Sequence, residues 1–96
     1  MTITEIMAAN KRAGYHFFDE DTLRFFGSRI EPKTYGRYFV TSEQRNTFDG
    51  PPEPRWWTVR RINDAGNIKT IGDFQQYATA AAAHEAARAA ARQEVR

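Results

Sequence analysis

Residues 55 to 61 read Arg55-Trp56-Trp57-Thr58-Val59-Arg60-Arg61, which places both tryptophans of the chain side by side among arginines. Neighbouring side chains of a β-strand point to opposite faces, so one tryptophan can enter a core while the other stays outside. The arginines obey the same alternation, and Arg60 therefore shares a face with Trp56. We expect this stretch to be the middle strand of a sheet, with either Trp56 or Trp57 exposed.

Two further strands are predicted beside this stretch. Residues 37 to 43, like residues 55 to 62, are rich in the aromatic and β-branched side chains that favour strands. Residues 67 to 74 follow the turn sequence Asn63-Asp64-Ala65-Gly66, so we expect an antiparallel hairpin with the middle strand. The proline-containing connection of residues 44 to 54 tolerates neither a helix nor a central strand and is expected to be a loop.

Three helices are predicted from their start signals. The capping residues are Thr2, Asp19 and Thr79. The first helix is expected over residues 3 to 12, with Glu5 completing a capping box, and the second is expected to end at Gly27. Alanine fills ten of residues 78 to 91, so the last helix can approach a sheet closely.

A block of phenylalanines precedes the strands. Phe17, Phe18, Phe25 and Phe26 fall within ten residues. Leaving each of them exposed would forfeit roughly 1.5 to 3 kcal/mol of burial free energy. We therefore expect all four side chains in the core.

The predicted order of elements is α-α-β-β-β-α, an α+β fold in which helices cover one face of a three-stranded antiparallel sheet. One domain is expected to span residues 1 to 96, because a chain of this length has room for a single modest core. The face expected to be buried carries Tyr38, Val40, Trp57, Val59, Ile68 and Phe74. The opposite, open face would carry Arg37, Phe39, Thr41, Trp56, Thr58, Arg60 and Lys69. A slip of one residue would exchange the two faces.

The composition argues against several classes of site. The chain has no cysteine, which excludes disulfides and thiolate metal sites, and its two histidines stand in no metal-binding spacing. No nucleophile elbow and no glycine-rich phosphate loop occurs. We therefore expect no catalytic residues, no metal and no cofactor, and a protein that is not an enzyme. No apolar run approaches about 18 residues and no signal peptide is recognisable, so we expect a cytoplasmic protein without membrane insertion.

Binding is the function that remains. The predicted partner-binding residues are Arg37, Phe39, Trp56, Arg60 and Lys69 on the open face, together with Arg29 and Arg45. Arginine and aromatic side chains are favoured anchors of protein interfaces, and they also bind single-stranded nucleic acid by stacking and phosphate contacts. The net charge of +2, from 14 basic and 12 acidic residues, does not separate these two uses.

Part of the chain resembles a double-stranded RNA-binding domain. The likeness rests on the Gly50-Pro51 loop before the second strand, the hairpin turn at Gly66 and the alanine-rich last helix. It implies the order α-β-β-β-α. Where that family has a lysine cluster at the start of its last helix, this chain has Ala80-Ala81-Ala82-Ala83, so the resemblance carries the topology without the phosphate contacts.

A second pattern runs from residue 10 to residue 77. It consists of Asn10, Gly14, His16-Phe17-Phe18, Asp21-Thr22, Arg24-Phe25-Phe26, Ser28-Arg29, Tyr35-Gly36, Tyr38-Phe39, Thr41-Ser42-Glu43, Thr58-Val59-Arg60, Gly72, Phe74-Gln75 and Tyr77. The pattern resembles a group of small proteins from bacteriophages and mobile elements, mostly of unassigned function. The resemblance implies a phage or prophage protein, and such a small protein is expected to bind a host machine in the bacterial cytoplasm, in the manner of anti-CRISPR inhibitors. We expect it to be a monomer.

The specific hypothesis is stoichiometric inhibition of a host defence complex. A CRISPR surveillance complex would be bound and its binding of target DNA blocked. Two alternatives stay open, a nucleic-acid-binding module that uses the basic aromatic face and a phage interaction or structural protein.

Overall fold

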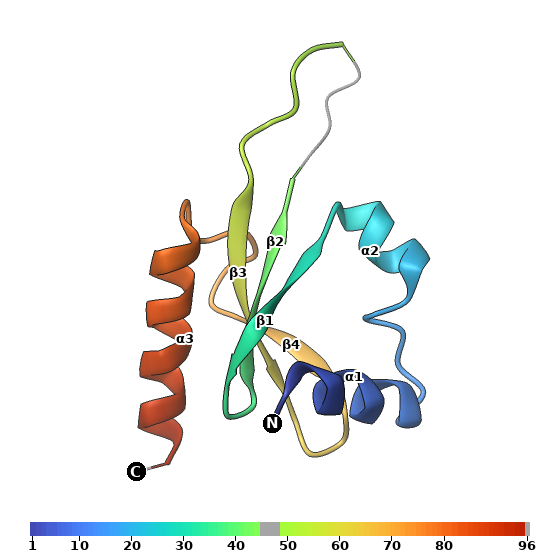
Figure 1. Cartoon of the computed structure of the whole chain (residues 1–96), viewed down its shortest axis with the longest axis vertical. Helices are drawn as coiled ribbons and strands as arrows, with labels where there is room; N and C mark the ends of the chain where they lie inside the picture. Colours follow the sequence, from blue (N-terminus) through green and yellow to red (C-terminus); the bar gives the residue numbers. More distant parts are fainter. Residues whose placement is uncertain (45–48, 96) are drawn as a thin grey trace.

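The computed structural model describes residues 1–44 and 49–95, and in these ranges the chain forms four strands and three helices (Figure 1). The strands are β1 (Arg29–Tyr35), β2 (Tyr38–Glu43), β3 (Trp56–Ile62) and β4 (Ile68–Ile71). They form one antiparallel sheet in the order β1-β2-β3-β4. The helices are α1 (Ile3–Arg12), α2 (Glu20–Phe26) and α3 (Ala80–Glu94). The predicted α+β fold with an antiparallel sheet is confirmed, and the tryptophan stretch forms β3 inside that sheet.

Strand β1 corrects the predicted count of three strands. It contains Pro32, which cannot donate a backbone hydrogen bond and is confined to edge strands and bulges. Both conditions hold here, because β1 lies at the edge of the sheet and its register against β2 shifts between Ile30 and Thr34. The order of elements is therefore α-α-β-β-β-β-α.

The helices begin where the capping signals predicted. Thr2 Oγ1 accepts a hydrogen bond from the Glu5 backbone, and the Glu5 carboxylate accepts one from the Thr2 backbone, which lowers the pKa of Glu5. Thr79 Oγ1 accepts a hydrogen bond in the first turn of α3. Helix α2 follows Asp19, whose side chain makes no capping bond, and it ends at Gly27 in the left-handed conformation.

Helices cover both faces of the sheet, which corrects the expectation that they share one face (Figure 1). On one face, Ala83 and Ala87 of α3 pack against a cluster of buried strand residues, namely Tyr38, Val40 and Val59. On the other face, Ile6 of α1 packs with Phe39 and Ile62, and the half-buried rings of Phe17 and Phe18 pack on this second cluster. The face predicted to be open is therefore a second core.

The register confirms part of the predicted alternation. Trp57 packs beside the α3 cluster and donates from Nε1 to Glu31 Oε1 at 3.2 Å, while Trp56 is the exposed tryptophan. Ile68 was expected on the same face as Trp57, and this is wrong. It pairs with Ile62 and belongs to the second core, because the turn between β3 and β4 sets the opposite parity. Phe74 lies beyond the end of β4 and is 44% exposed instead of buried.

Helix α1 is fastened to the turn between β3 and β4. The Asn10 side chain is buried, donates from Nδ2 to the Gly66 carbonyl at 2.9 Å and accepts from the Phe17 backbone at 3.2 Å. Gly66 lies so close to α1 that a Cβ atom there would stand 2.7 Å from Ala13 Cβ and 2.8 Å from the Ala9 carbonyl oxygen.

This contact predicts that Gly66→Ala destabilises the fold more than Gly14→Ala. Both glycines have positive φ angles, +82° and +87°, but a Cβ at Gly14 would meet no atom within 4 Å. Gly14→Ala should therefore cost about 1 to 2 kcal/mol for its left-handed backbone, and Gly66→Ala should cost a further 1 to 3 kcal/mol, roughly, for overpacking. Urea unfolding of both variants measures the difference, and equal losses would contradict the close packing of α1 on the turn.

The last turn of α3 is tied to β3 by an ion pair. Arg61 Nε donates to Glu94 Oε1 at 2.6 Å, and this hydrogen bond lowers the pKa of Glu94 in the folded chain. A lowered carboxyl pKa contributes stability that is complete above the ordinary value of 4.5 and is lost as the pH falls through the folded value. We therefore predict that Glu94→Gln flattens the pH dependence of unfolding below about pH 4.5. Denaturant unfolding between neutral pH and about pH 3 tests this, and unchanged curves would show that the pair contributes nothing.

Candidate functional site

The predicted binding residues Phe39 and Arg60 lie inside the protein. Phe39 is fully buried, and only 12% of the Arg60 side chain is exposed. Arg60 forms an ion pair with the buried Glu43, with 3.0 Å between Nη2 and Oε1. The expectation that these two side chains stand on an open sheet face is wrong, because α1 and the aromatic segment after it cover that face.

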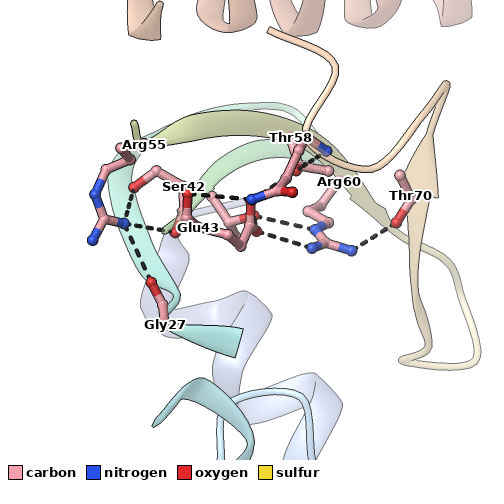
Figure 2. Close-up of polar contacts among 9 residues, drawn as sticks. Gly27, Ser42, Glu43, Arg55, Thr58, Arg60 and Thr70 are labelled. Atoms are coloured by element: carbon pink, nitrogen blue, oxygen red, sulfur yellow. Dashed lines mark hydrogen bonds and ion pairs between the residues drawn. The ribbon is translucent and has the colours of Figure 1, made fainter. Parts of the chain in front are cut away.

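A network of threonines completes this buried pair (Figure 2). Arg60 also donates to Thr41 Oγ1 at 3.2 Å and to Thr70 Oγ1 at 2.6 Å. Glu43 accepts from Thr41 at 2.6 Å and from Thr58 at 2.9 Å. Each charge thus has several hydrogen-bond partners, which is what a buried ion pair needs to offset its desolvation.

Two aromatic rings flank the Arg60 guanidinium. Its central carbon lies 5.3 Å from the centre of the Phe17 ring and 5.4 Å from that of the Phe74 ring. Phe74 is held over this face because the next residue, Gln75, donates its backbone N–H to Thr58 Oγ1 at 2.9 Å. The aromatic residues around Arg60 therefore close a structural centre, and they leave only part of the Phe74 ring accessible.

The other predicted residues are divided between the two ends of the sheet. Arg37 pairs with Asp64 at 2.6 Å beside the turn between β3 and β4, and the exposed Lys69 pairs in register with Arg61. Arg29 and Trp56 are exposed at the opposite end, where they stand in register with Ser42 and Glu43. The remaining predicted residue, Arg45, lies outside the described residues.

Helix α2 exposes phenylalanines that were expected in the core. Phe25 is 82% exposed and Phe26 is 47% exposed. Phe17 and Phe18 do pack against a core, as expected, but it is the core formed around Phe39, which was expected on the open face. Phe25 and Phe26 are adjacent in this seven-residue helix, so their side chains point about 100° apart. The burial argument treated the four phenylalanines alike, and it is wrong for these two.

The exposed rings form a chain across the surface. Phe25 and Phe26 meet edge to face with 5.0 Å between ring centres, and Phe26 meets Phe74 at 6.2 Å. Two hollows adjoin these rings, one of about 370 Å³ lined by Phe25, Phe26 and Phe74, and one of about 350 Å³ between Phe26 and Phe74 with Arg60 and Thr70 in its wall. We call the region formed by Leu23, Arg24, Phe25, Phe26, Arg29, Arg55 and Phe74 the α2 surface.

The arginines of the α2 surface line a further hollow. A third hollow, of about 470 Å³, is lined by Arg24, Arg29 and Arg55. Arg55 Nη1 lies within hydrogen-bonding distance of the Gly27 carbonyl (3.3 Å) and of the Ser42 carbonyl and hydroxyl (3.0 Å each), which ties the segment just before β3 to β2 and to the end of α2 (Figure 2). Burial lowers the pKa of Arg55, and the positive charge of Arg29 lowers it further.

The α2 surface therefore combines exposed rings with arginines whose positions are fixed by the fold. In the described ranges, no group of three His, Cys, Asp or Glu residues could hold a metal ion. None of the helices in the same ranges combines the length and the apolar character needed to cross a bilayer. What the arrangement offers chemically is contact area, cation–π partners and hydrogen-bond donors.

The buried pair predicts a large cost for Glu43→Gln. This change leaves the Arg60 charge without its partner in the interior, which should lower the free energy of unfolding by about 3 to 5 kcal/mol. Glu85→Gln is the matched control, since Glu85 pairs with Arg88 at 2.9 Å on the exposed face of α3 and should cost less than about 1 kcal/mol. Denaturant unfolding measures both, and similar losses would show that the Glu43–Arg60 pair is not a structural centre.

A protein family matches this chain, although no curated protein and no solved structure does. Residues 2–88 match the family of unknown function DUF7447. Since the match covers most of the sequence, this chain belongs to the DUF7447 family.

Proposed function

We propose that this chain is a non-catalytic binding protein that docks on a partner protein through the α2 surface. The observation that carries the proposal is the 82% exposure of Phe25 beside the partly exposed Phe26 and Phe74. Contiguous apolar area on a small domain commonly marks an interaction site, and aromatic side chains are frequent interface anchors. Burying one such ring completely is worth roughly 1.5 to 3 kcal/mol.

The α2 surface is also held in place before any partner arrives. Gly27 turns the chain at the end of α2, and its carbonyl accepts a hydrogen bond from Arg55, the residue before β3. Phe74 is fixed through the Gln75 backbone. A surface whose backbone is already ordered loses less conformational entropy on binding, which favours a protein-docking role.

The proposed partner is a complex of the bacterial host. The resemblance of the aromatic block to bacteriophage and mobile-element proteins supports a phage or prophage protein that acts in the host cytoplasm. Its partner would be a host defence complex, specifically a CRISPR surveillance complex that is prevented from binding target DNA. Of the residues predicted from the sequence, Arg29 belongs to the α2 surface, and Trp56 lies at the same end of the sheet.

Nucleic-acid binding is the second candidate. Phe25 is exposed on the same short helix as Arg24, an arrangement that could stack a base and contact a phosphate. Against this role, Arg24 is already paired with Glu20 at 2.9 Å and with Asp21 at 3.5 Å. Those two carboxylates would repel a continuous phosphate backbone.

We predict that Phe25→Ser reduces capture of the partner by at least roughly tenfold, because an anchoring ring is lost. The tagged chain would be used to capture complexes from lysates of bacteria that carry CRISPR systems, with identification by mass spectrometry. Met7→Ser is the matched control, since Met7 is a 43% exposed apolar residue of α1 outside the α2 surface. Both variants should keep the unfolding free energy of the unchanged chain within about 1 kcal/mol.

Three outcomes separate the candidates. Equal capture by the Phe25→Ser variant would rule out docking through the α2 surface. Salt-dependent binding of the isolated chain to short oligonucleotides, without capture of a protein, would favour the nucleic-acid role. Self-association in sizing experiments, with neither protein nor nucleic acid bound, would favour a structural phage protein.

A further inference from the structure

Two arginines at the hollow of about 470 Å³, Arg29 and Arg55, form no ion pair with a carboxylate among the described residues. Arg55 makes its hydrogen bonds to uncharged groups, the carbonyls of Gly27 and Ser42, the Ser42 hydroxyl and the Gln44 amide oxygen. Burial and then the positive charge of Arg29 lower the pKa of Arg55, while the carboxylates of Glu43 and Glu31 act in the opposite direction.

Three other arginines, by contrast, form ion pairs with carboxylates. Arg60 is paired with Glu43, Arg61 with Glu94 and Arg37 with Asp64. Arg55 is instead held by neutral acceptors beside a second arginine, at the wall of a hollow of about 470 Å³. Such a placement fixes guanidinium donors without using up their charge, which suits the binding of an external anion.

We propose that this hollow of about 470 Å³ binds a single carboxylate side chain from an aspartate or glutamate of the partner protein. A neighbouring apolar side chain of the partner enters the hollow of about 350 Å³ between Phe26 and Phe74. The two hollows adjoin, because Leu23 and Ser28 line both of them. The second hollow offers the rings of Phe17, Phe26 and Phe74 to an apolar group. This inference rests on the proposed docking function and specifies the chemistry of the docked segment.

The charges around the hollow favour one carboxylate over a nucleic acid. Glu20 lines the same hollow as the arginines, and Asp21 lies beside it on α2. Asp73 directly precedes Phe74 in the chain. One carboxylate would bring a single negative charge into a hollow lined by Arg29, Arg55 and Glu20, whereas a polyphosphate crossing the surface would bring several negative charges past Glu20 and Asp21. The guanidinium fork also matches the planar carboxylate group.

The test uses two blocked dipeptides, N-acetyl-aspartyl-phenylalanine amide and its asparaginyl counterpart, titrated separately into the ¹⁵N-labelled full chain. NMR spectra would follow the backbone amides of residues 23–28 and the arginine Nε–H signals. We expect the aspartyl peptide to shift the signals of Arg29 and Arg55 and to bind roughly tenfold more tightly than the asparaginyl peptide, since a charged hydrogen bond is exchanged for a neutral one.

The variant Arg29→Gln should remove most of that preference. Lys33→Gln is its matched control, because Lys33 is another exposed cation of β1 that does not line the hollow, and it should keep the preference. Equal binding of the two peptides, no response to the aspartyl peptide, or an unchanged preference in Arg29→Gln would each overturn the proposal. Tighter binding of a ten-nucleotide deoxythymidine oligomer at the same signals would also overturn it, in favour of phosphate.

Partner capture separates this inference from the docking function itself. If both Phe25→Ser and Arg29→Gln weaken capture while Lys33→Gln does not, the docking function and the carboxylate site are both supported. If Phe25→Ser weakens capture and Arg29→Gln leaves it unchanged, docking stands and the carboxylate site is wrong. If neither variant changes capture, docking through the α2 surface fails as well.

Discussion

Strand β2 is buried along its whole length, and this constraint organises the rest of the molecule. All six of its residues, Tyr38–Glu43, are shielded from solvent. Successive residues of a strand point to opposite faces, so a fully buried strand needs a cover on both sides. Helix α3 supplies one cover with its small alanines, and α1 with the aromatic segment that follows it supplies the other. A two-layer fold with one open sheet face could not satisfy β2.

The face of the sheet covered by α1 differs from the face covered by α3, because β2 places the carboxylate of Glu43 on it. Glu43 points away from α3 and would be costly to bury alone, so Arg60, Thr41 and Thr58 surround it. The end of the sheet beneath α2 is consequently polar. Phe74 lies beside the Arg60 guanidinium, 5.4 Å from its central carbon, and with Phe26 it lines a hollow that also contains Arg60 and Thr70. The exposed rings of the α2 surface therefore adjoin the polar centre of the core.

Much of the fold could be predicted from local signals. The helix starts at Thr2 and Thr79 depend on side chains a few residues apart, and so does the hairpin turn before β4. Strand β1 was missed because Pro32 disfavours a strand locally, while an edge position with a bulge tolerates it. Local sequence signals therefore fail where the position of a segment in the sheet decides whether it forms a strand.

The candidate site was harder to predict than the fold, because it depends on contacts between residues that lie far apart in the sequence. Alternation placed Phe39 and Arg60 on one face correctly, but it gave no information on whether a helix covers that face. Arg60 looked like a free cation because its partner, Glu43, lies 17 residues away in sequence. The predicted residue types, arginine beside aromatic rings, do occur together on the surface, but around α2 and Phe74 instead of on the sheet.

The family match covers most of the structure but not the end of α3. The matched residues 2–88 contain the α2 surface, the cover formed by α1, the first half of α3 and the buried pair. The match ends inside α3, before Glu94, so the ion pair that closes this helix on Arg61 lies partly outside it. Closing the helix end is a contribution to stability that other residues could make in other ways. The α2 surface, by contrast, lies wholly within the matched part and adjoins the polar core that contains Glu43 and Arg60.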